Sequence, residues 1–179
     1  PTQPASVYNA QDAACPFEFP VVLKPVQEGS SVGVHICRTP SDWATAVGKV
    51  QADVKQHPTR VYMVERAVLG GSELTVGMLD GKPLPPIQIK PSVEFYDYEA
   101  KYHRNDTQYV VDPPLPAGVG AAIQGFAKKM FDGLGARHLS RVDFLLDGSG
   151  KVWLLEVNTL PGFTDHSLLP MAANRQGLP

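Results

Sequence analysis

Two apolar stretches joined by a turn decide the fold of this chain: Ser140-Arg-Val-Asp-Phe-Leu-Leu146 and Trp153-Leu-Leu-Glu-Val-Asn-Thr-Leu-Pro-Gly162. The connecting Asp147-Gly-Ser-Gly150 is typical of a hairpin turn, so the two stretches are predicted to be paired antiparallel strands. An even-numbered loop centred on Gly148-Ser149 predicts that residue 143 pairs with 154 and residue 141 with 156.

Side chains in a strand alternate between its two faces. Arg141 and Asp143 are therefore expected on one face of the first strand, and Glu156 and Asn158 on one face of the second. The apolar opposite face consists of Val142, Phe144, Leu146, Leu155 and Val157. Two carboxylates and a carboxamide beside a cation form a hard-oxygen site of the kind that holds magnesium against phosphate oxygens.

The alternative is that Asp143 and Glu156 are simply solvent-exposed acids. Two carboxylates side by side in a half-buried sheet repel each other unless a cation or a raised pKa intervenes. A bound metal is the simplest remedy, and we favour it.

Composition excludes several classes of function. The chain has 179 residues, 43% hydrophobic and 19% charged, with a formal net charge of -2. This length suits one sizeable core or two small lobes. The absence of a basic stripe argues against nucleic acid, and the apolar runs are too short to span a membrane, so we expect a cytoplasmic protein. Cys15 and Cys37 fit neither a disulfide framework nor a metal site.

The periodicity predicts an α+β chain with two lobes after a lead-in segment, residues 1–18. Strands are expected at 19–24, 34–37, 60–65, 72–79 and 84–89, with a helix over 39–54 capped by Ser41. These make a small lobe, 19–90. The larger lobe, 91–179, begins with a long irregular loop, 91–116, which we expect to be functional. A helix over 117–134, the hairpin and a last helix from Ser167 follow.

Three further segments have a functional and a simpler interpretation. Glu28-Gly-Ser-Ser-Val-Gly33 is either a flexible hairpin or, with Lys24 at the preceding strand end, a phosphate cradle. Glu65 to Glu73 is either a polar connection or a hinge that binds a nucleotide base and ribose. Lys101-Tyr102 is either solvated or part of a lid that closes over phosphates.

In their order along the chain, these segments resemble the D-alanine-D-alanine ligase family of the ATP-grasp superfamily. The resemblance rests on Lys24-Pro25 with the glycine-serine loop, Tyr96-Asp-Tyr-Glu-Ala-Lys-Tyr102, Arg141-Val-Asp143 and Glu156-Val-Asn-Thr-Leu-Pro-Gly-Phe-Thr164. It covers nearly the whole chain from Phe19 and corresponds to the central and C-terminal domains. It implies an ATP-grasp fold, in which two α+β lobes hold the nucleotide between them.

The resemblance implies that ATP phosphorylates the carboxylate of one D-alanine and that the amine of a second attacks the acylphosphate, giving a dipeptide for peptidoglycan. It assigns ATP contacts to Lys24, Glu28, Ser31, Glu65, Arg66, Val68, Glu73 and Lys101. It assigns two magnesium ions, replaceable by manganese, to Asp143, Glu156 and Asn158. Arg141 and Gly162 are implied to stabilise the oxyanion, Ser30 and Tyr102 to complete the catalytic site, and Ser167 and Leu168 to bind the second substrate.

The resemblance also implies a homodimer in the full-length enzyme, and an N-terminal domain that this chain lacks. We therefore expect a fragment that keeps the ATP and metal framework and ligates poorly alone. Two alternatives stay open within the family: a catalytically incompetent Mg-ATP-binding module, and a relative that uses D-serine or D-lactate as acceptor. Outside the family, the alternative is an α+β interaction domain with an incidental acidic patch.

Overall fold

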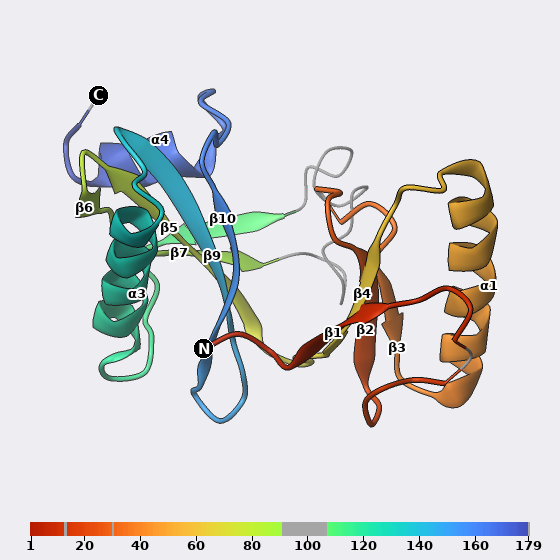
Figure 1. Cartoon of the computed structure of the whole chain (residues 1–179). Helices are drawn as coiled ribbons and strands as arrows, with labels where there is room; N and C mark the ends of the chain where they lie inside the picture. The colour runs from red at the N-terminus through yellow and green to blue at the C-terminus, as the bar shows by residue number, and fades with distance from the viewer. Residues whose placement is uncertain (13, 30, 91–106, 179) are drawn as a thin grey trace. The chain divides into compact units, whose positions relative to one another are not determined.

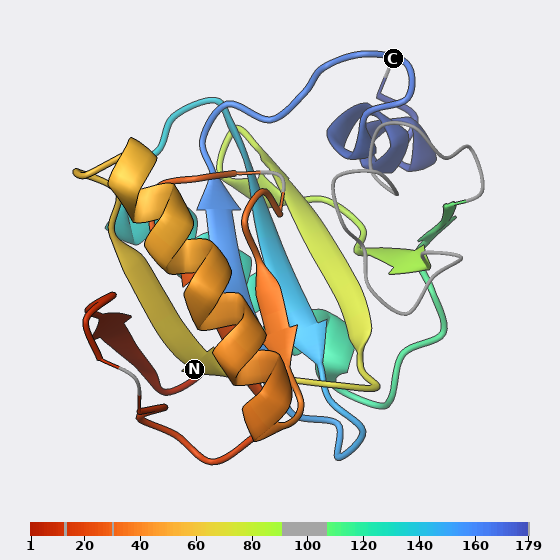
Figure 2. The ribbon, with the colours of Figure 1, turned by 90° about the vertical axis from the view of Figure 1, so that its right-hand side faces the viewer.

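A computed structural model describes residues 1–12, 14–29, 31–90 and 107–178. The chain divides into two compact units (Figures 1 and 2). One unit contains Gln3–Val68. The other contains Pro1–Thr2 and, among the described residues, 69–90 and 107–178. In the described part of the chain, no helix has the length and apolar character that crossing a membrane requires.

The Gln3–Val68 unit is built on a four-stranded antiparallel sheet with strand order β1-β4-β2-β3. The strands are β1 (Ala5–Tyr8), β2 (Val21–Pro25), β3 (His35–Cys37) and β4 (Tyr62–Arg66). Helix α1 (Pro40–Gln56) packs along one face of this sheet (Figures 1 and 2). The core joins both, since Trp43 and Val50 of the helix pack with Leu23 and Val64 of the sheet.

Helix α1 begins at Pro40, and its N-cap lies two residues before the cap expected from the sequence. Thr39, not Ser41, is the N-cap: its side chain accepts a hydrogen bond from the Asp42 backbone, and Asp42 caps in return. This reciprocal capping box satisfies two backbone donors, and Pro40 suits the first helical position because it has no N–H to leave unpaired.

The second unit is built on a six-stranded sheet with order β10-β9-β5-β7-β8, with β6 paired to β5. Its strands are β5 (Ser72–Leu79), β6 (Lys82–Pro83), β7 (Ile87–Lys90), β8 (Gln108–Val111), β9 (Leu139–Leu146) and β10 (Val152–Asn158). All pairings are antiparallel. The long strand β5 occupies the centre, with β9 on one side and β7 on the other.

Helices cover both faces of this sheet, and each of them contacts the central strand β5. Helix α3 (Val119–Gly133) packs on the face that carries Leu74, Val76 and Phe144. Helix α4 (Leu168–Arg175) packs on the other face, where Leu169 approaches Gly77 so closely that a Cβ there would lie 3.3 Å from its Cγ. The second face is therefore apolar near β7. Over β9 and β10 it carries the polar side chains described below.

The division into units differs from the lobe boundaries expected from the sequence. Residues 69–90, expected in the small lobe, belong to the same unit as the hairpin, because β5 pairs with β9 along its whole length, from Ser72↔Leu146 to Leu79↔Leu139. The expected lead-in, 1–18, contains β1, which pairs with β4. Strand β8 lies in the segment for which no regular structure was expected.

Candidate functional site

The four polar residues of the hairpin lie on one face of the sheet, as alternation predicted. The register is different from the expected one. Asp143 pairs with Glu156 and Arg141 with Asn158, not 143 with 154 and 141 with 156. The turn between the strands is odd-numbered, over 147–151, and the register shifts by one residue between Leu154 and Glu156, as at a β-bulge. The bulge restores the alternation that the odd turn would have reversed.

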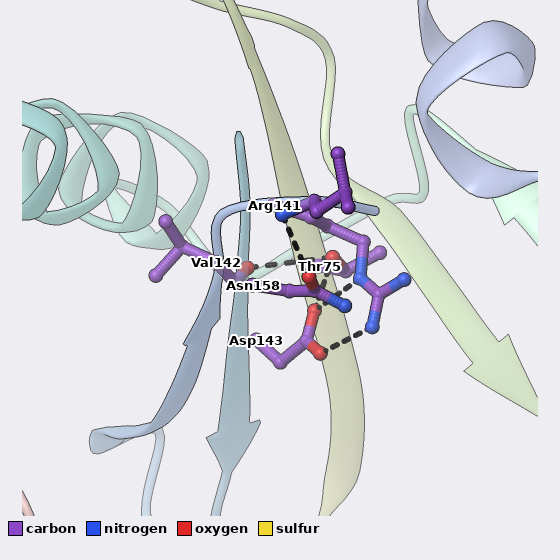
Figure 3. A network of polar contacts seen from close by, with 6 residues as sticks. Thr75, Arg141, Val142, Asp143 and Asn158 are labelled. Atoms are coloured by element: carbon purple, nitrogen blue, oxygen red, sulfur yellow. Dashed lines mark hydrogen bonds and ion pairs between the residues drawn. The ribbon is translucent and has the colours of Figure 1, made fainter. Parts of the chain in front are cut away.

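Arg141 and Asp143 form a bidentate ion pair along β9 (Figure 3). Arg141 Nε donates to Asp143 Oδ1 at 2.9 Å, and Nη2 donates to Oδ2 at 2.8 Å. Both side chains are largely buried, at 17% and 4% exposure. A planar guanidinium matches both oxygens of a carboxylate, so this geometry fixes the orientation of both groups.

Thr75 adds a third member to this network from the neighbouring strand β5 (Figure 3). Its hydroxyl donates to Asp143 Oδ1 at 2.6 Å, and the two residues are cross-strand partners. Thr75 was not among the site residues predicted from the sequence. Its one signal was a polar residue within the apolar run Leu74-Thr-Val76, and only the β5–β9 register reveals its partner.

The electrostatics of the face favour a charged guanidinium. Burial alone would lower the pKa of Arg141. The hydrogen bonds and charge of Asp143 outweigh that effect, with further contributions from Glu156 and Glu73, so the pKa of Arg141 is raised above its ordinary value. Three acids therefore act on one buried cation.

Glu156 and Asn158 lie on the edge strand β10. Glu156 is exposed and Asn158 is half-buried, with its Oδ1 accepting a hydrogen bond from the Leu160 backbone at 3.1 Å. Together with Asp143 they bring two carboxylates and a carboxamide to one side of the sheet, which is the donor chemistry that Mg²⁺ prefers.

The donor set fits a magnesium ion. Repulsion between Asp143 and Glu156, however, does not by itself require a metal. Arg141 already provides Asp143 with a counter-charge. Within the described residues, no group of three or more His, Cys, Asp and Glu side chains is placed to hold a metal; the third donor here is the amide of Asn158. Asp143 Oδ2 accepts one hydrogen bond and has capacity for a second interaction.

The residues expected at the nucleotide phosphates lie in the Gln3–Val68 unit. Lys24 of β2 forms an ion pair with Glu65 of β4, with Nζ 2.6 Å from Oε1. Glu28, at the start of the glycine-serine loop, forms an ion pair with Arg60, with Oε1 2.7 Å from Nη2. Arg60 lies two residues before β4. Ser31 has a positive φ of 60°. The structure thus places Lys24, Glu28, Ser31 and Glu65 within one unit.

The other residues expected at the nucleotide lie on either side of the division between units. Arg66 ends β4, and its backbone N–H donates to the Pro4 carbonyl at 3.1 Å. Val68 ends the first unit, and Glu73 lies on β5 in the second. Ser30, Lys101 and Tyr102 lie outside the described residues.

The residues expected at the second substrate lie together after β10. Ser167, the N-cap of α4, accepts a hydrogen bond from the Thr164 backbone at 2.9 Å. A Cβ at Gly162 would lie 3.0 Å from Ser167 Oγ, so a larger residue there would require the Ser167 side chain to shift. Leu168 follows as the first residue of α4.

Comparisons with known proteins identify one family. Residues 5–179 match the family model described as D-ala D-ala ligase C-terminus. The D-alanine--D-alanine ligase of Burkholderia pseudomallei is 41% identical over 170 residues, which are 95% of this chain and 53% of the relative. That of Hydrogenovibrio crunogenus is 43% identical over 155 residues, 87% of this chain and 48% of the relative. The chain spans about half the length of the curated relatives it matches.

Solved structures agree. The crystal structure of D-alanine--D-alanine ligase from Bacillus anthracis gives a TM-score of 0.76 at 31% identity, covering 98% of this chain and 57% of that one. The same enzyme complexed with ATP gives 0.72 at 26% identity, covering 98% and 55%. These matches, with the mixed helices and antiparallel sheets seen here, confirm the expected α+β, ATP-grasp fold class.

Proposed function

The chain belongs to the D-ala D-ala ligase C-terminus family, and on that premise we propose that it is the ATP- and metal-binding part of a D-alanine-D-alanine ligase. In this proposal the whole enzyme phosphorylates the carboxylate of one D-alanine with the γ-phosphate of ATP. The amine of a second D-alanine then attacks the acylphosphate, and the products are the dipeptide, phosphate and ADP. The dipeptide serves peptidoglycan synthesis.

The observation that carries the proposal is the polar face over β9 and β10, where Arg141, Asp143, Glu156 and Asn158 lie together by register. Transfer of a phosphoryl group to a carboxylate brings anionic oxygens together, so it needs positive charge at fixed positions. Asp143, Glu156 and Asn158 hold two magnesium ions in this proposal, which supply that charge when bound.

Arg141 provides the charge for the second half of the reaction. Attack by the amine makes a tetrahedral centre with a developing oxyanion, which a preorganised donor stabilises. The raised pKa of Arg141 keeps the guanidinium protonated throughout, so it donates hydrogen bonds to that oxyanion, together with the Gly162 backbone. No side chain has to act as a covalent nucleophile.

The remaining residues bind the substrates. Lys24, Ser31 and Lys101 contact the ATP phosphates, and Glu28 belongs to the loop that covers them. Glu65, Arg66, Val68 and Glu73 hold adenine and ribose. Ser30 and Tyr102 complete the catalytic site, and Ser167 with the Leu168 amide takes the carboxylate of the second D-alanine. Manganese is expected to replace magnesium.

Calorimetry tests the metal and nucleotide part of the proposal. We expect a non-hydrolysable ATP analogue to bind the 179-residue chain in the presence of Mg²⁺ and to bind much more weakly in excess chelator. Equal binding with and without Mg²⁺, or no binding at all, would contradict the assignment. As a control, Lys128→Gln changes an exposed helix residue whose partner is Asp132 of the same turn, and it should bind like the parent.

The alternative within the family is a nucleotide-binding module without catalysis. A coupled assay for ADP release with D-alanine separates the two. Normal turnover would exclude the module and contradict our expectation that the chain alone ligates poorly. With a full-length enzyme, comparing D-alanine, D-serine and D-lactate as acceptors tests the second-substrate assignment, for which we expect preference for D-alanine.

A further inference from the structure

Thr75 is a buried polar residue that none of the roles above uses. It is 1% exposed and lies in the middle of β5, between the apolar residues Leu74 and Val76. Its hydroxyl is 2.6 Å from Asp143 Oδ1 and 3.4 Å from the Val142 carbonyl (Figure 3). A hydroxyl has one proton to donate, and the shorter contact to a charged acceptor takes it. Thr75 is therefore a dedicated donor to Asp143.

The two oxygens of Asp143 are used unequally. Oδ1 accepts from Thr75 at 2.6 Å and from Arg141 Nε at 2.9 Å. Among the described residues, Oδ2 accepts from Arg141 Nη2 alone, at 2.8 Å. Each carboxylate oxygen accepts about two such bonds. Oδ1 is therefore saturated within the protein, and Oδ2 is the oxygen with capacity for a further partner.

The carboxylate is held in this orientation by donors from two strands. Arg141 lies two residues from Asp143 on β9, so it moves with the same strand. Thr75 approaches from β5 through the direct cross-strand pair Thr75↔Asp143. Without the hydroxyl, Asp143 would depend on the guanidinium alone for its orientation, and that guanidinium is the group assigned to the substrate's oxyanion.

We propose that Thr75 is a positioning residue for metal binding: its hydroxyl fixes Oδ1 of Asp143 so that Oδ2 is presented to the cation. This inference rests on the proposed function. Thr75 itself contacts neither metal nor substrate. The simpler alternative is that Thr75 only satisfies a buried carboxylate, in which case its loss lowers stability and leaves metal affinity unchanged.

The test measures Mn²⁺ affinity by electron paramagnetic resonance, with an ATP analogue present, in the parent chain and three variants. Thr75→Val keeps the shape and removes the donor, and we expect Mn²⁺ to bind about tenfold more weakly, the lower end of the effect of losing a hydrogen-bond partner of a metal ligand. Thr75→Ser keeps the hydroxyl and should bind like the parent. Ser72→Ala removes a hydroxyl of the same strand that accepts from Gln88 on the opposite face, and should also bind like the parent.

Unfolding by urea, followed in the same samples, separates positioning from stability. A loss of stability in Thr75→Val with unchanged Mn²⁺ affinity overturns the inference and leaves the proposed function standing. If the valine variant does not fold, Thr75→Cys, with a weak thiol donor, replaces it; equal affinity of the cysteine and serine variants also overturns the inference. Absence of Mn²⁺ binding in the parent overturns both proposals.

Discussion

Each of the two units contains an aspartate that accepts hydrogen bonds from an arginine and a hydroxyl. In the first unit, Asp53 accepts from Arg60 at 2.7 Å and from Tyr62 at 2.8 Å. In the second, Asp143 accepts from Arg141 and Thr75. The chemistry is the same, but the side chain of Asp53 is 27% exposed and that of Asp143 is 4% exposed.

The surroundings of the two networks differ as well. Asp53 lies on α1, and its network connects a helix to the loop before β4, with Glu28 as a second partner of Arg60. Asp143 lies mid-strand, with Glu156 directly across the ladder. We infer that the first network stabilises its unit and that the second, buried and rich in acids, binds a cation. Donor identity alone does not distinguish the two roles.

Asp143→Asn is expected to have the largest effect. It leaves the buried guanidinium of Arg141 without its bidentate partner, so we expect the free energy of unfolding to fall by about 3 kcal/mol. Urea denaturation measures this. The same variant should lose Mg²⁺-dependent binding of an ATP analogue, and retention of that binding would remove the functional distinction between the two networks.

Glu156→Gln is expected to separate metal binding from stability. Glu156 is exposed, so the change should lower the free energy of unfolding by less than about 1 kcal/mol. The loss of one anionic oxygen should weaken Mg²⁺-dependent nucleotide binding at least about tenfold, equivalent to about 1.4 kcal/mol. An unchanged affinity in calorimetry would favour the incidental acidic patch.

Asp53→Asn is the change that matches Asp143→Asn in the other unit. Its carboxylate is partly exposed and its pairing with Arg60 is screened by solvent, so the free energy of unfolding should fall by at most about 1 kcal/mol. Mg²⁺-dependent nucleotide binding should not change. A loss of Mg²⁺ dependence comparable to that of Asp143→Asn would contradict the inference that the Asp53 network only stabilises its unit.

Tyr62→Phe is expected to have the smallest effect and to depend on pH. Burial, and then the hydrogen bond to Asp53, raise the pKa of Tyr62 from 10.0 to about 12. A raised pKa means that the folded chain holds this proton more tightly, so the contribution is complete below pH 10 and is lost as the pH rises toward 12.

The parent chain should therefore be about 0.5 kcal/mol more stable than Tyr62→Phe at neutral pH. The difference should shrink as the pH passes from 10 toward 12. Urea denaturation at a series of pH values measures it. A difference that stays constant over this range would show that the Tyr62 hydroxyl is not held as the structure indicates.

Alternation along two strands was enough to predict which polar side chains share a face of the sheet. The shared side of Arg141, Asp143, Glu156 and Asn158 is confirmed by the register, although the register itself was wrong. A turn over 147–151 and a bulge near Leu155 shift the pairing twice, and their effects on facing cancel. Neither is visible in hydrophobic pattern, because a bulge depends on how the partner strand is hydrogen-bonded.

Contacts distant in sequence were not predictable in the same way. The pairing of β5 with β9 places residues 69–90 in the second unit, and Thr75 contacts Asp143 through it. Both depend on residues sixty or more positions apart in sequence. The cap at Thr39 was missed by two residues because Ser41 is an equally suitable residue type; only the backbone at Thr39 and the return bond from Asp42 decide it.

Diffraction from crystals of the chain soaked with Mn²⁺ and a non-hydrolysable ATP analogue tests the central claim most directly. We predict two anomalous peaks next to Asp143, Glu156 and Asn158, with Asp143 Oδ2 at about 2.1 Å from one of them. Bound nucleotide with no manganese at these residues, or manganese at another site, would contradict the assignment of this face to metal-dependent phosphoryl transfer.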